Sequence, residues 1–100
     1  NVFAVTDGAL YTPSESDGAL PGIARRTVLK EADRLGILTR ERSIAPEEIA
    51  AADEVFLTNV VTGVVPVVSL SATLVGSGRP GLVTERLARA YWDRVRTELS

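Results

Sequence analysis

Two residue types are missing altogether, because the 100 residues include no cysteine and no histidine. Without cysteine the chain can form no disulfide bond and offers no thiolate. Without histidine as well, it lacks the usual zinc ligands and the Ser–His and Cys–His pairs of nucleophilic catalysis. The sequence contains no run of about 18 apolar residues, the length that a membrane-spanning helix requires. The net charge of −2 gives no sign of a nucleic-acid partner.

The residues that are present are typical of one small folded domain. Hydrophobic residues make up 45% of the sequence and charged residues 24%, so disorder is not expected. The first residues lack the basic and apolar regions of a signal peptide, and we expect a cytoplasmic location. Because Asn1–Thr6 already has the character of a strand, we expect the chain to be a piece of a longer polypeptide.

The first third of the chain predicts a β-hairpin followed by a helix. Residues 2–5 are apolar, and residues 9–12 form the return strand after Asp7-Gly8, the strongest two-residue hairpin signal. A loop rich in proline, serine, aspartate and glycine follows over residues 13–22. Residues 23–36 then show apolar side chains at helical spacing and end in a glycine, a natural helix stop.

The rest of the chain alternates strands and helices. We expect, in order, a strand over 39–44, a helix from Pro46 to about Ala52, a strand over 54–58, a strand over 64–70, a loop over 76–81 and a final helix. Pro66 places the 64–70 strand at an edge or a bulge. The predicted order, β-β-α-β-α-β-β-α, is that of an α/β fold with a layered or barrel-like sheet. The final helix should pack on the sheet through Val83, Leu87, Tyr91, Val95 and Leu99.

One candidate anion site is the start of the helix at residue 23. Gly22, Ile23 and Ala24 lead into it, and unpaired N–H groups and the positive end of the helix dipole suit a phosphate there. Unpaired N–H groups occur at the start of any helix, so the same residues also fit a helix start without a ligand.

A second candidate site is the turn from Asn59 to Gly63. It follows an apolar strand, and ligands of α/β folds gather at such strand ends. The Asn59 side chain and the amides of Val60 and Val61 could face an anion there. A simple strand-to-strand connection is the alternative.

Other charged residues have simpler explanations. Lys30, the only lysine, invites comparison with Schiff-base lysines, but it shares an i, i+4 stripe with Arg26 and Arg34 that predicts a solvated helix face. Asp53 and Glu54 are neighbours at the start of a strand, so their carboxylates should point to opposite faces and form no acid–base pair.

Longer motifs join the two turns. They are LPGIARRTVLKEADRLGI, ERSIAPEEIAAADEVFLTN, VVPV and GLVTERLARAYW, in this order. Together they resemble the C-terminal part of the fold-type IV pyridoxal-phosphate enzymes, which include branched-chain aminotransferases, D-amino acid aminotransferases and 4-amino-4-deoxychorismate lyase. The opening NVF and GALYTP also fit the sheet hairpin of that family. The resemblance implies the D-amino acid aminotransferase-like fold, a mixed sheet or pseudo-barrel with covering helices.

The resemblance also implies roles for both turns. Ile23 and Ala24 would offer backbone N–H groups to the phosphate of pyridoxal 5′-phosphate, and Gly22, also cofactor-binding, would let the phosphate approach the backbone closely. Asn59 and Val60 would hold the other side of that phosphate.

Three further positions follow from the same resemblance. The amide of Val61, with that of Val60, would approach the substrate carboxylate. Ala24 replaces a threonine that is common in the family, which keeps the N–H and loses a hydroxyl. Arg25 matches the arginine of the family's Gly-Ile-x-Arg motif and would support the turn.

Within the family, the string DEVFLTN followed by a Gly-Val-Val-Pro-Val run looks most like the 4-amino-4-deoxychorismate lyases, in which asparagine is common at the position of Asn59. The chain departs from these lyases at Val61 and Thr62, where they often carry leucine and methionine. The resemblance therefore implies a lyase that forms 4-aminobenzoate and pyruvate in folate biosynthesis. A branched-chain or D-amino acid aminotransferase and a non-enzymatic domain are the alternatives.

In the family, the Schiff-base lysine and the carboxylate that pairs with the pyridine nitrogen precede the position of Asn1, as do the N-terminal domain and a phosphate-binding arginine. We therefore expect residues 1–100 to be a fragment of the C-terminal, cofactor-binding domain, inactive alone and without catalytic residues or metal ligands. The parent enzyme would be a homodimer that acts on a small molecule, with neither nucleic acid nor membrane as partner.

Overall fold

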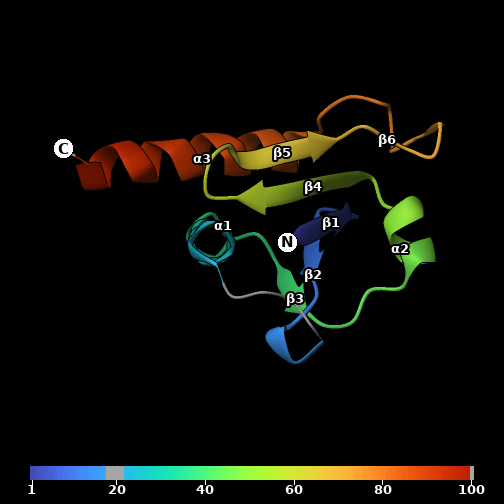
Figure 1. The fold of residues 1–100 in the computed structure, drawn as a ribbon, viewed down its shortest axis with the longest axis horizontal. Helices are drawn as coiled ribbons and strands as arrows, with labels where there is room; N and C mark the ends of the chain where they lie inside the picture. Colours follow the sequence, from blue (N-terminus) through green and yellow to red (C-terminus); the bar gives the residue numbers. More distant parts are fainter. Residues whose placement is uncertain (18–21, 100) are drawn as a thin grey trace.

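The computed structural model describes residues 1–17 and 22–99, and these form a mixed sheet with helices packed on it (Figure 1). The strands and helices are β1 (Val2–Thr6), β2 (Ala9–Thr12), the 3-10 turn η1 (Glu15–Asp17), α1 (Ile23–Arg34), β3 (Thr39–Glu41), α2 (Pro46–Ala50), β4 (Glu54–Asn59), β5 (Gly63–Val67), β6 (Ser69–Leu70), β7 (Thr73–Leu74) and α3 (Leu82–Leu99). Within this described part of the chain, no helix is both long and apolar enough to cross a membrane.

The main sheet has the strand order β3-β2-β1-β4-β5. All neighbouring strands are antiparallel except β2 and β3, which run parallel. Asp7 and Gly8 both have positive φ, 51° and 78°, and close the predicted hairpin between β1 and β2. Pro66 lies in β5 at the edge of the sheet, as predicted, where its missing N–H leaves no ladder hydrogen bond unmade on the open side.

Two of the predicted strands differ from those in the structure. The strand expected over residues 64–70 is divided, because β5 ends at Val67 and β6 leaves the main sheet to pair with β7. Ser71 and Ala72 close this small hairpin with φ of 49° and 66°. Serine and alanine rarely adopt such angles, so the sequence carries no turn signal there. The strand over 39–44 is also shorter than predicted. Pro21, at the end of the expected 13–22 loop, lies outside the described residues.

The two faces of the sheet pack differently. Phe3 and Phe56 are paired across β1 and β4, and their rings stack with centroids 4.8 Å apart. Together with Val5 and Leu10 they belong to one core cluster with residues of α1 and α3. Alternate residues on the opposite face pack on a smaller cluster that includes Ala52 and Val75. The larger core therefore lies between the sheet and the two long helices.

The apolar stripe predicted for the final helix lies largely against this core. Leu87 and Tyr91 are buried, and Val83 and Val95 pack against the same cluster at its margin. The side chain of Leu99 lies outside the described part of the structure. The prediction that α3 covers the sheet is confirmed.

Asp53 and Glu54 serve two separate contacts, as their opposite orientation predicts. The Asp53 carboxylate accepts the N–H of Asp7 in the first hairpin at 2.9 Å. The Glu54 carboxylate accepts the N–H groups of Val83 at 3.3 Å and Thr84 at 2.7 Å, at the start of α3. A carboxylate at a helix N-terminus satisfies unpaired donors and is stabilised by the helix dipole.

A buried carboxylate joins the two long helices. Glu31 of α1 is only 2% exposed and binds Arg34 of the same helix at 2.9 Å and Arg94 of α3 at 3.1 Å. Burial raises the pKa of Glu31, but the hydrogen bonds and charges of the two arginines outweigh burial and leave the pKa below its usual value. The charged form is therefore the one that stabilises the packing of α1 on α3.

The turn between β4 and β5 is anchored at its far end by Gly63. This glycine has a φ of +72°, and a Cβ atom placed on it would lie 2.6 Å from Cε1 of Tyr91. The aromatic ring of Tyr91 packs edge-on against Trp92, with ring centroids 5.1 Å apart. Only glycine combines the left-handed backbone with this close approach.

We predict that Glu31→Gln lowers the free energy of unfolding at neutral pH. About 1–3 kcal/mol is expected, less than for a fully buried pair because Arg34 and Arg94 are partly exposed. Since the pKa of folded Glu31 lies below its unfolded value, the stabilisation is complete above about 4.5, its ordinary value, and is lost as the pH falls through the lower, folded pKa. Urea unfolding from pH 7 to 3 should show the difference shrinking with acid. The exposed pair Asp93–Arg96 provides the control Asp93→Asn, which should change little; an equal effect of both variants would contradict the prediction.

Gly63→Ala should destabilise the chain more than Gly8→Ala. Both glycines have positive φ, but Gly8 has nothing within 4 Å of the position of a Cβ atom. Gly8→Ala should therefore cost only the left-handed backbone term, about 1–2 kcal/mol. Gly63→Ala adds the collision with Tyr91 and should cost about 2–4 kcal/mol in total. Equal midpoint shifts in urea unfolding would show that Tyr91 does not hold the turn.

Candidate functional site

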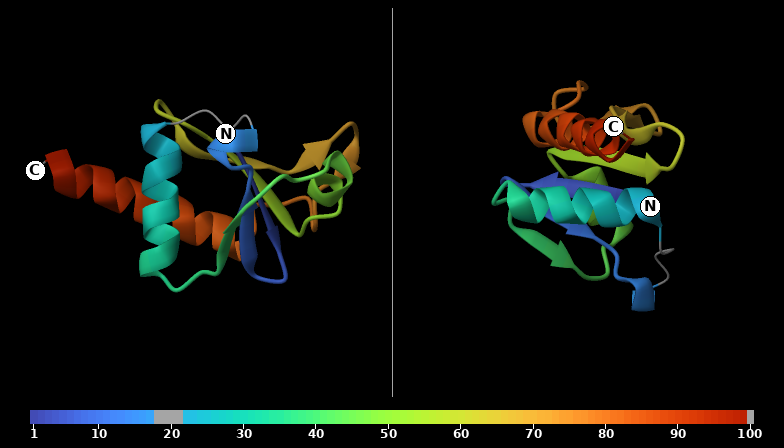
Figure 2. Two further views of the ribbon diagram at one scale, coloured as in Figure 1. Left: turned by 90° about the horizontal axis from the view of Figure 1, so that it is seen from below. Right: turned by 90° about the vertical axis from the view of Figure 1, so that its left-hand side faces the viewer.

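Both predicted turns lie at the same end of the sheet. The N–H of Thr58 donates to the carbonyl oxygen of Asn1 at 2.9 Å, and the nitrogen of Asn1 donates to the Thr58 carbonyl at 3.3 Å. A Cβ atom placed on Gly22 would lie 3.8 Å from Nδ2 of Asn1. Both views in Figure 2 place the start of α1, the start of β1 and the β4–β5 turn side by side. Asn1 therefore lies between the two segments that the sequence assigns to an anion site.

The start of α1 has the properties of an open anion site. Gly22 is extended, at φ −161° and ψ 151°, and no side chain caps the helix there. The first turn contains no acidic residue. Among the described residues, the N–H groups of Ile23 and Ala24 have no hydrogen-bond acceptor, while that of Arg26 begins the helical pattern by donating to Gly22 at 3.0 Å. The free N–H groups and the helix dipole both favour a negative ligand.

Arg25 connects this helix start to the β2–β3 edge of the sheet. Its side chain is buried, and one Nη2 atom donates to the carbonyl of Pro13 at 3.0 Å and to the Glu41 carboxylate at 2.9 Å. Pro13 follows β2 and Glu41 ends β3, so one guanidinium fixes α1 against two strands. This arrangement agrees with the supporting role expected for Arg25.

The β4–β5 turn is organised around the side chain of Asn59. Its Oδ1 atom accepts the N–H of Val61 at 2.9 Å, the N–H of Thr62 at 2.8 Å and the hydroxyl of Thr62 at 2.8 Å. The Val60 N–H has no acceptor within the described part of the chain. In this conformation the N–H of Val60 can donate to a bound anion. A contact of the Val61 N–H with a substrate carboxylate stays a prediction, and it requires the hydrogen bond from Val61 to Asn59 to break.

A buried hydroxyl lies beside this turn. Thr58 is 7% exposed, and its Oγ1 atom has no hydrogen-bond partner in the described structure. Because side chains alternate along β4, Thr58 shares with Phe56 the face that α1 covers. Thr84, at the start of α3, also has an unpaired buried hydroxyl, so this feature alone does not identify a site. The unpaired hydroxyl of Thr58, however, lies beside the start of α1 and the β4–β5 turn, whose N–H groups lack acceptors among the described residues.

The side chain of Lys30 is exposed to solvent and forms no ion pair among the described residues. It lies on α1 and lines a depression together with Ile23, Arg26, Thr27, Arg94 and Glu98. This placement agrees with a solvated helix face. Among the described residues, no group of histidine, cysteine, aspartate and glutamate side chains could hold a metal ion.

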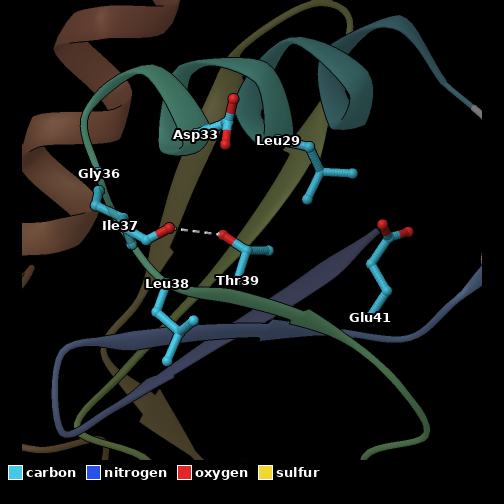
Figure 3. A pocket seen from close by; sticks show the side chains of 7 residues that line it. All are labelled: Leu29, Asp33, Gly36, Ile37, Leu38, Thr39 and Glu41. Carbon is cyan, nitrogen blue, oxygen red and sulfur yellow. Dashed lines mark hydrogen bonds between the residues drawn. The ribbon is translucent and has the colours of Figure 1, made fainter.

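A depression of about 480 Å³ lies at the other end of α1 (Figure 3). It lies between the end of α1 and β3, and the Thr39 hydroxyl donates to the Ile37 carbonyl on its floor at 3.1 Å. No residue of either predicted turn contributes to its walls, so its chemistry is separate from that of the candidate anion site. The lining residues are Leu29, Asp33, Gly36, Ile37, Leu38, Thr39 and Glu41.

Known proteins resemble the chain over almost its whole length. The family model described as amino-transferase class IV matches residues 1–70. The branched-chain-amino-acid aminotransferase of Escherichia coli is 42% identical over 92 residues, which cover 92% of this chain and 30% of that protein. A probable branched-chain-amino-acid aminotransferase of Thermotoga maritima is 45% identical over 91 residues, covering 91% and 33%. The chain thus spans about a third of the length of these relatives.

Solved structures agree with the sequence comparison. The Escherichia coli branched-chain amino acid aminotransferase superposes with a TM-score of 0.90 at 42% identity, over 93% of this chain and 31% of that one. The branched-chain amino acid aminotransferase of Thermobaculum terrenum, solved in its PLP-bound holo-form, gives a TM-score of 0.88 at 35% identity, over 94% and 31%. The α/β fold and the family expected from the motifs are confirmed, whereas these relatives carry the name of the aminotransferase and not that of the lyase. The chain belongs to the class IV aminotransferase family.

Proposed function

We propose that these 100 residues bind the cofactor phosphate in a pyridoxal-phosphate-dependent aminotransferase that acts on branched-chain amino acids. The observation that carries the proposal is the uncapped start of α1 beside the turn that begins at Asn59. The N–H groups of Ile23 and Ala24 there have no acceptor among the described residues. Relatives at 42% identity are named branched-chain-amino-acid aminotransferases, and the solved relatives include one in its PLP-bound form.

The residues present fit a phosphate group. The N–H groups of Ile23 and Ala24 lie at the positive end of α1, and that of Val60 lies in the neighbouring turn. Each hydrogen bond from an N–H to a charged oxygen contributes about 1.5–3 kcal/mol. Ala24 provides its N–H without a hydroxyl. The hydroxyl of Thr58 is a buried side-chain group at this end of the sheet with no hydrogen-bond partner among the described residues.

The chemistry of transamination is supplied by pyridoxal phosphate when bound, through the electron-withdrawing ring that the cofactor carries. The part played by this chain is positional. N–H groups fixed on α1 and on the β4–β5 turn hold the phosphate at one point, and Arg25 keeps α1 in place through Pro13 and Glu41. A rigidly held phosphate limits the orientations open to the rest of the cofactor, which lowers the entropic cost of reaching the reactive geometry.

We further propose that the remaining parts of the enzyme supply the catalytic lysine and the partner of the pyridine nitrogen. In this proposal residues 1–100 are a portion of the C-terminal, cofactor-binding domain, and the enzyme is a homodimer. Large apolar side chains are exposed around the candidate site, with Ile23 at 63%, Val60 at 67% and Val61 at 80%. Such surface is typical of a region covered by further protein or by a ligand. We expect the 100 residues alone to be inactive.

The relatives favour an aminotransferase over the lyase predicted from the Asn59 turn. We expect the protein that carries this chain, loaded with pyridoxal phosphate, to transfer the amino group of leucine, isoleucine or valine to 2-oxoglutarate. Glutamate formation is the measurement, with D-alanine as the comparison substrate. Release of 4-aminobenzoate from 4-amino-4-deoxychorismate, without glutamate formation, would overturn the aminotransferase and restore the lyase.

The phosphate site can be tested by removing one N–H group at a time. Proline is tolerated at the first position of a helix and lacks an N–H, so Ile23→Pro should keep α1 and weaken phosphate binding. One lost hydrogen bond to a charged acceptor should raise the Kd for inorganic phosphate about ten-fold. Leu82→Pro is the matched control, because Leu82 is the first residue of α3 and is similarly exposed, at 79% against 63%. Equal Kd values for the two variants would place the phosphate elsewhere.

A further inference from the structure

The buried side chain of Thr58 has a defined place beside the start of α1. Asn1 and Thr58 exchange two backbone hydrogen bonds, of 2.9 Å and 3.3 Å, and so extend the antiparallel pairing of β1 with β4 by one residue. Residues that are directly opposite in this way share a face of the sheet, with Cβ atoms about 5.5 Å apart. A Cβ atom placed on Gly22 would lie 3.8 Å from Nδ2 of Asn1. Asn1 thus links Thr58 to the residue that precedes α1.

The neighbour of Thr58 on the other side leads to the same helix start. Val64 is paired with Thr58 across β4 and β5 and belongs to the same buried cluster as Ala24, in the first turn of α1. Phe56, two residues before Thr58 on β4, is in this cluster as well. Because alternate residues of a strand share a face, the Thr58 side chain lies on the face that α1 covers. Its two cross-strand neighbours, Asn1 and Val64, both place it beside the first turn of α1.

The hydroxyl is the part of Thr58 that the fold leaves without a partner. Thr58 is 7% exposed, and its Oγ1 atom has no hydrogen-bond partner in the described structure. Its backbone N–H and carbonyl are both bonded to Asn1. Buried hydroxyls without a partner are uncommon, because burial removes the water that would otherwise bind them. A hydroxyl has one O–H to donate, and a negatively charged oxygen at the start of α1 would accept it.

Thr84 at the start of α3 provides a comparison within the same chain. It is also buried, with an unpaired hydroxyl. There, however, the Glu54 carboxylate accepts the N–H groups of Val83 at 3.3 Å and Thr84 at 2.7 Å, so the chain itself supplies the negative charge that this helix start attracts. The first turn of α1 has neither a side-chain cap nor an acidic residue. An external anion can therefore bind beside Thr58, whereas Glu54 would repel one beside Thr84.

We propose that the Thr58 hydroxyl donates a hydrogen bond to the cofactor phosphate, in addition to the N–H groups of Ile23, Ala24 and Val60. This inference rests on the proposed function and deepens it, because it adds a side-chain donor to the same site. The hydroxyl comes from the face of the sheet, whereas the N–H groups come from α1 and from the β4–β5 turn. Donors on three separate elements would fix the orientation of the phosphate as well as its position.

The first test is the stability of the protein that carries this chain, prepared without cofactor or phosphate. The hydroxyl then has no partner, so Thr58→Val, which replaces it by a methyl group of similar size, should leave the thermal midpoint unchanged or raise it. Valine also suits a strand. Thr84→Val is the matched control and should behave in the same way. A clear loss of stability in Thr58→Val alone would show that the hydroxyl has a partner within the fold and would overturn the proposal.

The second test is the Kd of the same variants for inorganic phosphate. Thr58→Val should raise the Kd about ten-fold, as expected for one lost hydrogen bond to a charged oxygen. Thr58→Ala removes the same hydroxyl with less bulk and should match it. Thr84→Val should keep the native Kd, and Thr58→Ser, which keeps the hydroxyl, should stay within about three-fold of it. An unchanged Kd in Thr58→Val and Thr58→Ala would overturn the proposal, as would an equal loss of affinity in Thr58→Ser.

Failure of the proposed phosphate site would give a different result. If the native protein and Ile23→Pro bind inorganic phosphate with the same Kd, the start of α1 is not the site. If Ile23→Pro weakens binding and Thr58→Val does not, the site stands and only the role of Thr58 is contradicted.

Discussion

The antiparallel pairing of β1 with β4 is the constraint on which the rest of the structure depends. It stacks Phe3 on Phe56 and so builds the core on which α1 and α3 pack. The same pairing continues to Asn1 and Thr58, which brings the β4–β5 turn to the start of α1. One ladder thus produces both the buried apolar layer and the edge where unpaired N–H groups collect. A shift of this register by one residue would turn the phenylalanines to the opposite face and separate the two turns.

Local sequence patterns predicted most of the fold because most of its signals are local. Asp7-Gly8 specifies a tight hairpin, and the apolar spacing after Ile23 specifies α1. The β6–β7 hairpin was missed because Ser71 and Ala72 take up positive φ without the residues that normally mark such a turn. The buried carboxylate of Glu31 was also out of reach, because Arg94 lies 63 residues further along the chain. Contacts of that separation depend on how helices pack and leave no periodic pattern.

The residues alone indicate both turns as candidate anion sites, and the resemblance to a family assigns the two turns to one cofactor phosphate. The pattern could not show that Gly22 approaches Asn1, since this follows from the pairing of β1 with β4. Nor could it show that the exposed Asn59 side chain accepts hydrogen bonds from Val61 and Thr62, because an asparagine at a strand end can equally bind only water. Asn59 also drew the prediction toward a lyase. A single turn is weaker evidence than 42% identity over 92 residues, which favours the aminotransferases.

The central claim is that the start of α1 and the β4–β5 turn together bind the phosphate of pyridoxal 5′-phosphate. The most direct test is a crystal structure of the protein that carries this chain, with the cofactor bound. We predict that phosphate oxygens lie within hydrogen-bond distance of the N–H groups of Ile23, Ala24 and Val60. A phosphate held elsewhere, with these three N–H groups facing only water, would contradict it.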